Sequence, residues 1–590
     1  MPSYRFIFLT ACAILMACTG YAALVLSMTC WAEARQLDII FPFYKWRIQP
    51  FSAATYDGTR AGLALATGLL AALMATLLAS ARSRRELAAL GRELQQSWRS
   101  LGTGLRGLTS TQQRQALLAF AGLSALRLYF SLYNPEYDDA VSYEVFVSKG
   151  LLATSAYYPI PNNHVFSNTI SLLFYQVSHG FWWSMRLPVL LISTGATIFL
   201  FAALRRWVGF RVAAVAVFLF STLQLSLYHA GVGRGYWLEI LLAGMVFFCA
   251  LELTRPAGRA RAAWAGLLVA GVLGCYTVPP FVYVLASAFS WLGLAALHQR
   301  QGRALLQLLL GGLLVGLSAS VLYTPLVLVS GLGALVGNGY VAALAPARFW
   351  PGLPVYLWFN EGFLAGHRTV GALLTVPVLA LAGWLLYLAQ AGRLPRLRAQ
   401  RLRHVGLPAL WFVGLPYAVI IVQRVFPPER VMLYKAFFFF ILVGLVLDWL
   451  LDQWPTLRWA RPLLGTATGL FVAYQTYLVE RINPHIRSQN AAYRAGLHWL
   501  ENQPLAPTLV PEPTHNLFFR FYAHSEQLPR PWRFDNEQQP HTHYAYVVAF
   551  PDNRGFFKPE FPFPPAYHNA QVDIYVMPKD YRLATQTWLH

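Results

Sequence analysis

Two neighbouring carboxylates are the clearest candidates for chemistry in this chain. Asp138 and Asp139 are the only aspartates between Asp57 and Asp448, in a stretch of mostly apolar residues. Carboxylates at a membrane boundary are costly to desolvate and are usually retained for chemistry, ion binding or charge pairing. A carboxylate beside a hydroxyl can take its proton as that hydroxyl attacks an electrophilic carbon, and two adjacent carboxylates raise the pKa of one of them. The pair therefore suits a general base.

Cationic residues stand in short turn-like motifs elsewhere in the chain. Arg234 lies in Gly233-Arg234-Gly235-Tyr236, and Arg430 lies in Pro427-Pro428-Glu429-Arg430. An anionic lipid phosphate needs cationic partners, and the planar guanidinium binds phosphate oxygens in a bidentate way. If one membrane face holds these cations and the aspartates together, the set suits group transfer from a lipid phosphate carrier.

The composition indicates that membrane helices position these groups. Hydrophobic residues make up 56% of the 590 residues and charged residues 12%, against about a quarter charged in soluble proteins. Several apolar runs reach the roughly 20 residues that a helix needs to cross a bilayer. The net charge of +21 comes largely from arginines dispersed among short loops, without a basic face or a nucleic-acid-binding motif. We therefore expect a polytopic membrane protein that does not bind nucleic acid.

Hydropathy predicts thirteen membrane spans. They lie near residues 5–29, 61–80, 115–133, 186–204, 211–228, 236–253, 262–276, 279–297, 304–330, 370–390, 406–422, 431–451 and 462–480. With the N-terminus in the cytoplasm, every connection on the inner side is rich in arginine, as the positive-inside rule requires. Loops 134–165 and 331–369 then lie outside, and so do the aspartates. The apolar segment Phe166–Gly180 would invert this scheme if it crossed, so we expect a short helix at the outer face.

Residues 481–590 differ from the rest in composition. They contain eight of the fourteen histidines, many prolines, and alternating runs near 544–548 and 572–576 that are typical of strands. We expect a small soluble α/β domain on the outer side of the membrane. The five cysteines lie in or beside apolar segments and show no metal-binding spacing, and the histidines lack supporting ligands.

Five motifs in sequence order carry a resemblance to a known superfamily. They are Asp138-Asp139 with the following Tyr143 and Gly150, Asn163-His164-Val165-Phe166, Arg186-Leu187-Pro188, Gly233-Arg234-Gly235-Tyr236, and Pro428-Glu429-Arg430. This set resembles the C-type (GT-C) membrane glycosyltransferases, the superfamily of protein O-mannosyltransferases and of the lipid A aminoarabinose transferase. Residues 115–480 are covered, and the prolines that normally follow the histidine motif are missing after His164.

The resemblance implies an all-α polytopic membrane fold of GT-C type with a small C-terminal α/β domain. Residues 1–114 would add two spans and a basic cytoplasmic loop, 115–480 would form the catalytic module, and 481–590 the extracytoplasmic or periplasmic domain. The implied activity is hexosyl or pentosyl transfer from a polyprenyl-phosphate-linked sugar to an envelope protein, lipid or glycan. It would take place at the outer face of the inner (plasma) membrane, usually with inversion at the anomeric carbon.

The same resemblance implies roles for individual residues. Asp138 is the expected base, and Asp139 would orient the acceptor or share that role. The donor phosphate would bind Arg234 and Arg430, with His164 and Lys435 as further candidates. Substrate binding is expected of three residues: Tyr143, Asn163 and Tyr236. No cofactor is certain, and because metal dependence varies in the superfamily, a divalent cation (Mg²⁺ or Mn²⁺) at the aspartates stays open.

Other interpretations compete with this one. The aspartates are also compatible with a solvated turn, Arg234 with a helix end anchored at lipid headgroups, and His164 with an ordinary loop residue. Glu429 could be a local charge partner of Arg430, and Lys435 could extend to the interface. For the whole chain the alternatives are a multi-pass transporter and a lipid-binding envelope-assembly protein. A transporter usually places polar groups near the middle of the bilayer, whereas here they cluster at one expected face.

Overall fold

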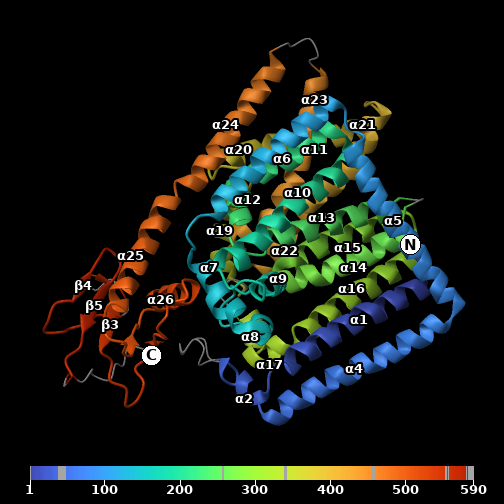
Figure 1. Cartoon of the computed structure of the whole chain (residues 1–590). Helices are drawn as coiled ribbons and strands as arrows, with labels where there is room; N and C mark the ends of the chain where they lie inside the picture. The colour runs from blue at the N-terminus through green and yellow to red at the C-terminus, as the bar shows by residue number, and fades with distance from the viewer. Residues whose placement is uncertain are drawn as a thin grey trace.

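The computed structural model describes residues 2–37, 48–255, 258–337, 342–453, 459–551, 555, 557–579 and 581. A bundle of long helices makes up most of the chain, and a small α/β region lies beside one end of it (Figure 1). The expected inner connection 452–461 and outer loop 331–369 each include residues outside the described part, as does the last part of 481–590.

Among the described residues, ten helices are long and apolar enough to cross a membrane. They are Tyr4–Ser27 (α1), Ala53–Ala79 (α4), Trp182–Val208 (η4 and α10), Tyr236–Leu253 (α13), Ala260–Thr277 (α14), Pro279–His298 (η5 and α15), Gly302–Leu322 (α16), Val370–Gln390 (α20), Arg396–Gln423 (α21, η6 and α22) and Glu429–Gln453 (η7 and α23). Two further expected spans are the helices α6 (Ser110–Ser131) and α24 (Ala460–Glu480), which are less apolar. The helical polytopic fold class is therefore confirmed.

The expected span 211–228 is not a continuous helix. The chain forms α11 (Phe210–Thr222) and α12 (Gln224–Gly231), which are bent by 66° about Leu223. The backbone N–H of Gln224, freed by the break, donates a hydrogen bond to Oε1 of Gln475 in α24 over 2.8 Å. A break inside a membrane helix is tolerated where neighbouring groups satisfy the backbone in this way.

The expected span 304–330 is also divided. Its second part is a separate short helix, α17 (Thr324–Ser330), with Pro325 in the first turn. Proline is well suited to the first turn of a helix because the missing N–H would have no partner there.

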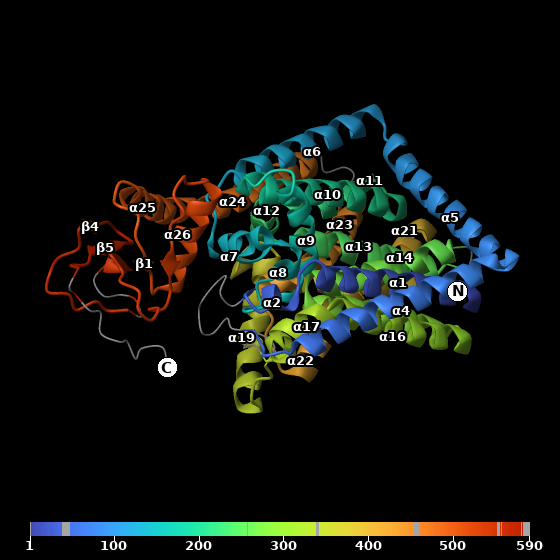
Figure 2. The same ribbon diagram turned by 60° about the horizontal axis from the view of Figure 1, so that its bottom comes forward.

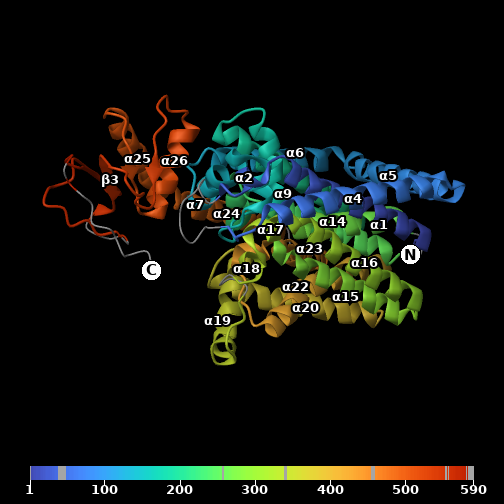
Figure 3. The same ribbon diagram turned by 90° about the horizontal axis from the view of Figure 1, so that it is seen from below.

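Short helices gather at one end of the bundle. They are α7 (Tyr137–Val141), η2 (Ser142–Phe146), η3 (Val147–Lys149), α8 (Gly150–Ala156), α9 (Val165–Tyr175), α17 and α18 (Leu332–Val336). The longer helix α19 (Pro346–Leu364) projects from the bundle in Figure 3. α9 has 11 residues, about 16 Å at the usual helix rise, against a hydrocarbon core of about 30 Å. The short helix expected within Phe166–Gly180 is therefore present as α9.

The opposite end carries most of the ion pairs between helices. The amphipathic helix α5 (Ala81–Arg106) runs there between α4 and α6, at the periphery of the bundle in Figure 2. Arg261, at the start of α14, pairs with Glu86 and Glu93 of α5 at 2.6 and 3.0 Å. Arg211 of α11 similarly pairs with Asp448 and Asp452 of α23 at 2.9 and 3.0 Å.

The best-buried helices, α13 and α23, connect the two ends. α13 packs against α10, α14, α15 and α23, and Trp237 near its start is completely buried. Phe438 of α23 lies against Phe247 of α13, with ring centroids 4.9 Å apart. The turn before α13 and the short helix η7 (Glu429–Met432) lie at the same end as α7, since Arg234, Arg430 and Asp138 line one cavity.

The C-terminal region follows α24 through α25 (Asn483–Glu501). Its small mixed sheet has the order β2-β1-β3-β5-β4, from β1 (Thr508–Leu509), β2 (Phe534–Asp535), β3 (Tyr546–Ala549), β4 (Tyr567–His568) and β5 (Asp573–Val576). The helix α26 (Pro513–Ser525) lies between this sheet and the bundle (Figure 1). Asn490 donates a hydrogen bond to the carbonyl of Pro135 over 3.0 Å, and His524 lies 3.0 Å from Glu144. The α/β region therefore contacts the segment that carries the aspartates.

Candidate functional site

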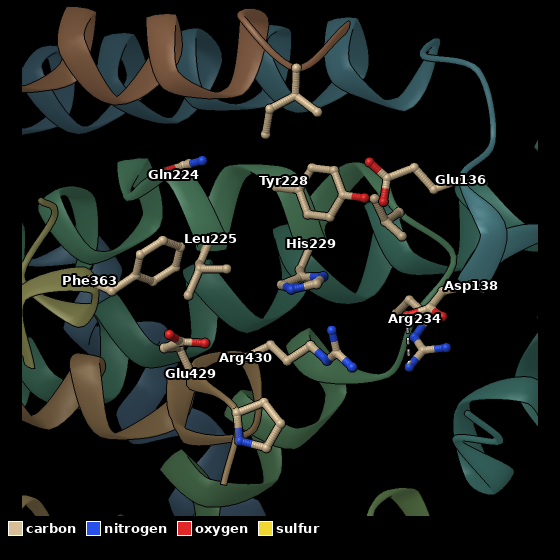
Figure 4. Close-up of a pocket in the computed structure, with 13 residues that line it drawn as sticks. Glu136, Asp138, Gln224, Leu225, Tyr228, His229, Arg234, Phe363, Glu429 and Arg430 are labelled. Carbon is tan, nitrogen blue, oxygen red and sulfur yellow. Dashed lines mark ion pairs between the residues drawn. The ribbon is translucent and has the colours of Figure 1, made fainter. Parts of the chain in front are cut away.

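A cavity of about 280 Å³ with several charged side chains in its wall lies where α7, α12 and η7 meet. Glu136 and Asp138 line it from the α7 segment, and Arg430 lines it from η7. Arg234 enters from the turn between α12 and α13 (Figure 4). The fold thus brings together motifs that are separated by up to three hundred residues in the sequence.

A second, smaller cavity of about 90 Å³ shares Arg234, Pro428 and Arg430 with the first. Its other walls include Asn163, His164, Tyr236 and Glu239. The two arginines therefore stand at the junction of the two cavities, and a ligand bound to them has access to both.

The two aspartates have different surroundings. The side chain of Asp138 is 38% exposed, and its nearest cation is Arg234, with Oδ2 3.7 Å from Nη2. Asp139 is fully buried: its Oδ2 pairs with Nη2 of Arg186 at 2.7 Å, and its Oδ1 accepts from the N–H of Gly233 at 2.8 Å. Asp138 therefore faces the cavity with a free carboxylate edge, whereas both oxygens of Asp139 are engaged.

The environment of Asp139 identifies it as part of the framework. Burial raises the pKa of Asp139, whereas Arg186 and the Gly233 N–H lower it. The charge of the neighbouring Asp138 also raises this pKa, but it contributes least. Arg186 also donates to the carbonyl of Gly231. Arg186 and Asp139 together hold both sides of the turn that presents Arg234.

Arg234 is buried and held by oriented partners. Its Nη1 donates to the carbonyl of Asn162 over 3.1 Å, and its Nη2 lies 3.0 Å from Nε2 of His164. The Gly235 N–H donates to Nδ1 of His164 over 3.1 Å. Burial, followed by the charge of Arg234, places the pKa of His164 well below its ordinary value. A neutral imidazole has one acceptor nitrogen, so it satisfies only one of these two donors.

Arg430 differs from Arg234 in having a free guanidinium. No hydrogen bond or ion pair joins its side chain to another residue in the described part of the chain. Its neighbour Glu429 pairs instead with Arg368, at 3.6 Å. In Figure 4 the Arg430 side chain extends beneath His229 toward Asp138 and Arg234. This is the geometry of a cation available to an anionic ligand.

Two of the three residues expected to bind substrate line the smaller cavity. Tyr236 lies edge-on to His164, with ring centroids 4.8 Å apart. Asn163 donates to the carbonyls of Thr154 and Tyr157 over 2.8 and 3.0 Å. Its amide therefore fixes the loop before α9, so that it shapes the cavity wall.

Two other expected binding residues line neither cavity. Tyr143 is buried against Phe521 and His524 of the α/β region and donates to the carbonyl of His179 over 2.7 Å. Lys435 is buried in α23, where it pairs with Glu361 and contacts the hydroxyl of Tyr417. Because its charge is neutralised by Glu361, Lys435 has no free charge to offer a donor phosphate.

Several cavity residues have no role in the sequence-based prediction. Glu136 and His229 line the larger cavity, and Glu239 lines the smaller one. Burial raises the pKa of Glu136, and a hydrogen bond with Tyr228 opposes this shift. Its place in the same acidic loop was the only signal available. Arg186 appears in the sequence as part of a motif, but its contact with Asp139 becomes visible only in the fold.

The described residues do not form a ready metal site. No group of three or more histidines, cysteines, aspartates or glutamates among them is placed to hold an ion. Asp139 cannot contribute without breaking its contacts with Arg186 and Gly233. A divalent cation (Mg²⁺ or Mn²⁺) at the aspartates stays a prediction from the resemblance.

Comparison with solved structures defines the class of fold. The chain has the fold of the GT-C membrane glycosyltransferases. It is similar to the crystal structure of ArnT from Cupriavidus metallidurans bound to undecaprenyl phosphate, with a TM-score of 0.51, 14% identity, and coverage of 79% of this chain and 98% of that one. AglB from Archaeoglobus fulgidus, in complex with an inhibitory peptide and a dolichol-phosphate, gives a TM-score of 0.40 at 12% identity over 70% of this chain and 64% of that one. No protein-family model and no curated protein matches the sequence.

Proposed function

We propose that this protein is a membrane glycosyltransferase that moves a sugar from a polyprenyl-phosphate donor to an acceptor hydroxyl. The observation that carries the proposal is the presence of two groups at one cavity: the carboxylate of Asp138, which is 38% exposed and 3.7 Å from Arg234, and the guanidinium of Arg430, which has no partner among the described residues. The GT-C fold and the undecaprenyl phosphate named for ArnT support a lipid-linked donor.

The reaction is a single displacement at the anomeric carbon. The acceptor oxygen forms a bond to this carbon as the bond from the carbon to the phosphate oxygen breaks. The electron pair of the broken bond stays on the lipid phosphate, and the acceptor proton passes to the carboxylate of Asp138. Attack opposite the leaving phosphate inverts the anomeric configuration.

The arginines supply electrostatic stabilisation. Arg430 and the spare N–H groups of Arg234 face the phosphate, whose negative charge grows as it leaves. Their preorganisation differs: Arg234 is held by Asn162 and His164, whereas Arg430 gains its partner from the ligand. Asp139 acts as a positioning residue, since it holds the turn that presents Arg234 through Arg186 and Gly233.

The charge distribution supports an orientation in the membrane. The end that carries Arg206, Arg211 and Arg261 lies opposite the cavity. By the positive-inside rule this end is cytoplasmic. The N-terminus is then cytoplasmic in the plasma membrane, and the cavity and the C-terminal α/β region are extracytoplasmic. Proteins, lipids and glycans of the envelope are the acceptors available on that side.

Donor consumption by the full-length protein tests this proposal. The protein in lipid nanodiscs is incubated with undecaprenyl-phosphate-linked sugars and an envelope extract, and release of bare undecaprenyl phosphate is followed by mass spectrometry. We expect release with the wild-type protein and its collapse in Asp138→Asn, with undecaprenyl phosphate binding retained. Unchanged release in Asp138→Asn would exclude Asp138 as the base. Movement of intact donor across the bilayer without release would indicate a transporter.

A further inference from the structure

A carboxyl group in the wall of the smaller cavity has no partner. Glu239 lies in the first turn of α13 and has no exposed surface. Neither of its side-chain oxygens accepts a hydrogen bond from another described residue. The positive end of the α13 dipole favours a carboxylate in this position, but it supplies no hydrogen-bond donor to the side chain.

An unpartnered buried carboxyl is expensive to retain. Burial of a polar group without a hydrogen bond costs about 1–3 kcal/mol in proteins, and more when the group is charged. The hydroxyl of Tyr434, on the adjacent helix α23, is also buried without a partner. A donor-bearing ligand in the cavity would satisfy Glu239.

The walls of this cavity have the chemistry of a sugar site. Tyr158 and Tyr236 provide aromatic surfaces, while Pro279 and Pro280 add apolar surface. Arg234 and Arg430 close the side that is shared with the larger cavity. One compartment therefore offers aromatic rings, a hydrogen-bond acceptor and cations, the groups that a glycosyl phosphate needs.

We propose that the smaller cavity holds the sugar of the donor and that Glu239 selects it, by accepting a hydrogen bond from a hydroxyl or ammonium group on the ring. This inference rests on the proposed function. The phosphate at the two shared arginines places the attached sugar in the adjoining cavity. The acceptor then approaches the anomeric carbon from the larger cavity, beside Asp138.

The chemistry of Glu239 predicts how it discriminates. A site built to hydrogen-bond a substrate group rejects a ligand that lacks this group, because the buried acceptor is then left unpaired. Bare polyprenyl phosphate, which carries no sugar, should therefore bind less tightly than the correct donor. Removal of Glu239 should abolish this difference without weakening the contact between the phosphate and the arginines.

The test compares the affinity of bare and sugar-bearing lipids for the full-length protein in nanodiscs. The probes are undecaprenyl phosphate alone and undecaprenyl phosphate carrying glucose, arabinose or 4-amino-4-deoxyarabinose. We expect the wild-type protein to bind at least one sugar-bearing lipid about tenfold or more tightly than the bare lipid. Glu239→Leu should lose this preference and bind the bare lipid as before.

The variant Glu239→Gln distinguishes recognition of a sugar hydroxyl from recognition of a sugar ammonium group. Glutamine keeps one acceptor oxygen but has no charge, so it should preserve part of a preference based on a hydroxyl. It should lose nearly all of a preference based on an ammonium group. Glu252→Gln is the matched control, since Glu252 lies on the same helix but pairs with Arg206 and Arg259 at the other end of the bundle. The Glu252→Gln protein should prefer the sugar-bearing lipid over the bare lipid as strongly as the wild-type protein does.

Three outcomes would overturn the inference. They are a wild-type protein without preference for any sugar-bearing lipid, a preference that survives in Glu239→Leu, and tighter binding of bare undecaprenyl phosphate by Glu239→Leu. The last outcome would place Glu239 beside the lipid phosphate. Thermal unfolding of each variant separates a fold defect from a loss of preference. Failure of the proposed function looks different: no lipid phosphate binds, and Arg430→Gln changes nothing.

Discussion

The two ends of the helical bundle differ in whether all of their arginine and carboxylate groups have close partners. At the end that carries α5, Arg261 makes close ion pairs with two glutamates, at 2.6 and 3.0 Å. At the cavity end, Arg430 has no described partner, and Asp138 approaches Arg234 only to 3.7 Å. Satisfied charges join helices to one another, whereas unsatisfied charges beside a cavity are available to a ligand.

A single helix shows the same contrast. α13 carries Glu252 at one end, where it pairs with Arg206 and Arg259 at 2.7 and 3.0 Å. At its other end Glu239 faces the smaller cavity, and its carboxyl oxygens accept no hydrogen bond from any residue that the structure describes. The residue type alone does not distinguish these two roles, but the surroundings do.

The largest effect on stability is expected from Asp139, the satisfied carboxylate of the cavity end. Asp139→Ala leaves Arg186 buried without its counter-charge, and breaking a buried ion pair costs about 3–5 kcal/mol. Thermal unfolding in detergent should therefore show a much lower midpoint. Asp138→Ala is the matched control and should unfold close to the wild-type temperature. Equal destabilisation of the two variants would contradict the division of roles between the aspartates.

Arg430 is expected to affect ligand binding more than stability. Arg430→Gln removes a charge-assisted contact with phosphate, a type of bond worth about 1.5–3 kcal/mol. The affinity for undecaprenyl phosphate should therefore fall about 10- to 100-fold, as measured by titration of the protein in nanodiscs. The unfolding temperature should change little. A normal affinity in this variant would place the lipid phosphate elsewhere.

The contact between the C-terminal region and the bundle should depend on pH. Burial alone would raise the pKa of Glu144, but hydrogen bonds from His524 and Lys149 hold this pKa below its ordinary value. Because the pKa of Glu144 is lowered in the folded protein, its ionised form stabilises the contact at pH values above the ordinary glutamate pKa, about 4.3. This stability is lost as the pH falls through the pKa of Glu144 in the folded protein. The protection factors of the α26 amides, which correct for the slower intrinsic exchange in acid, should therefore fall between about pH 7 and about pH 3.5. Glu144→Gln should remove most of this pH dependence.

The smallest effect is expected at the opposite end of the bundle. Arg211 is about half exposed in its pairs with Asp448 and Asp452, and such surface pairs contribute about 0–1 kcal/mol. Arg211→Gln should keep both donor consumption and lipid affinity. A large loss of activity would show that the charges at this end do more than join helices.

The sequence predicts the spans better than their interruptions. Runs of about twenty apolar residues have no other stable arrangement in a membrane protein, so hydropathy finds them. The bend at Leu223 has no proline or glycine to mark it, and Gln475, which satisfies the freed N–H, lies far along the chain. A break stabilised by such a distant residue cannot be read from the local sequence.

The candidate site shows a similar limit. The adjacency of Asp138 and Asp139 predicts that one acts as a base, but not that α7 turns the other toward Arg186. Successive helical residues point about 100° apart, so their roles separate only when the neighbours are known. For Lys435 the deciding neighbour is Glu361, which belongs to an expected outer loop. The partners of ionisable side chains come from tertiary packing.

A single-turnover experiment on Asp138→Asn tests the central claim most directly. Donor is first bound to the protein in nanodiscs, acceptor extract is then added, and release of undecaprenyl phosphate is followed in time. We predict that Asp138→Asn binds the donor with wild-type affinity and releases the lipid phosphate about 10²- to 10⁴-fold more slowly, the usual contribution of a general base. Release at the wild-type rate from the preformed complex would contradict the assignment of Asp138 as the base.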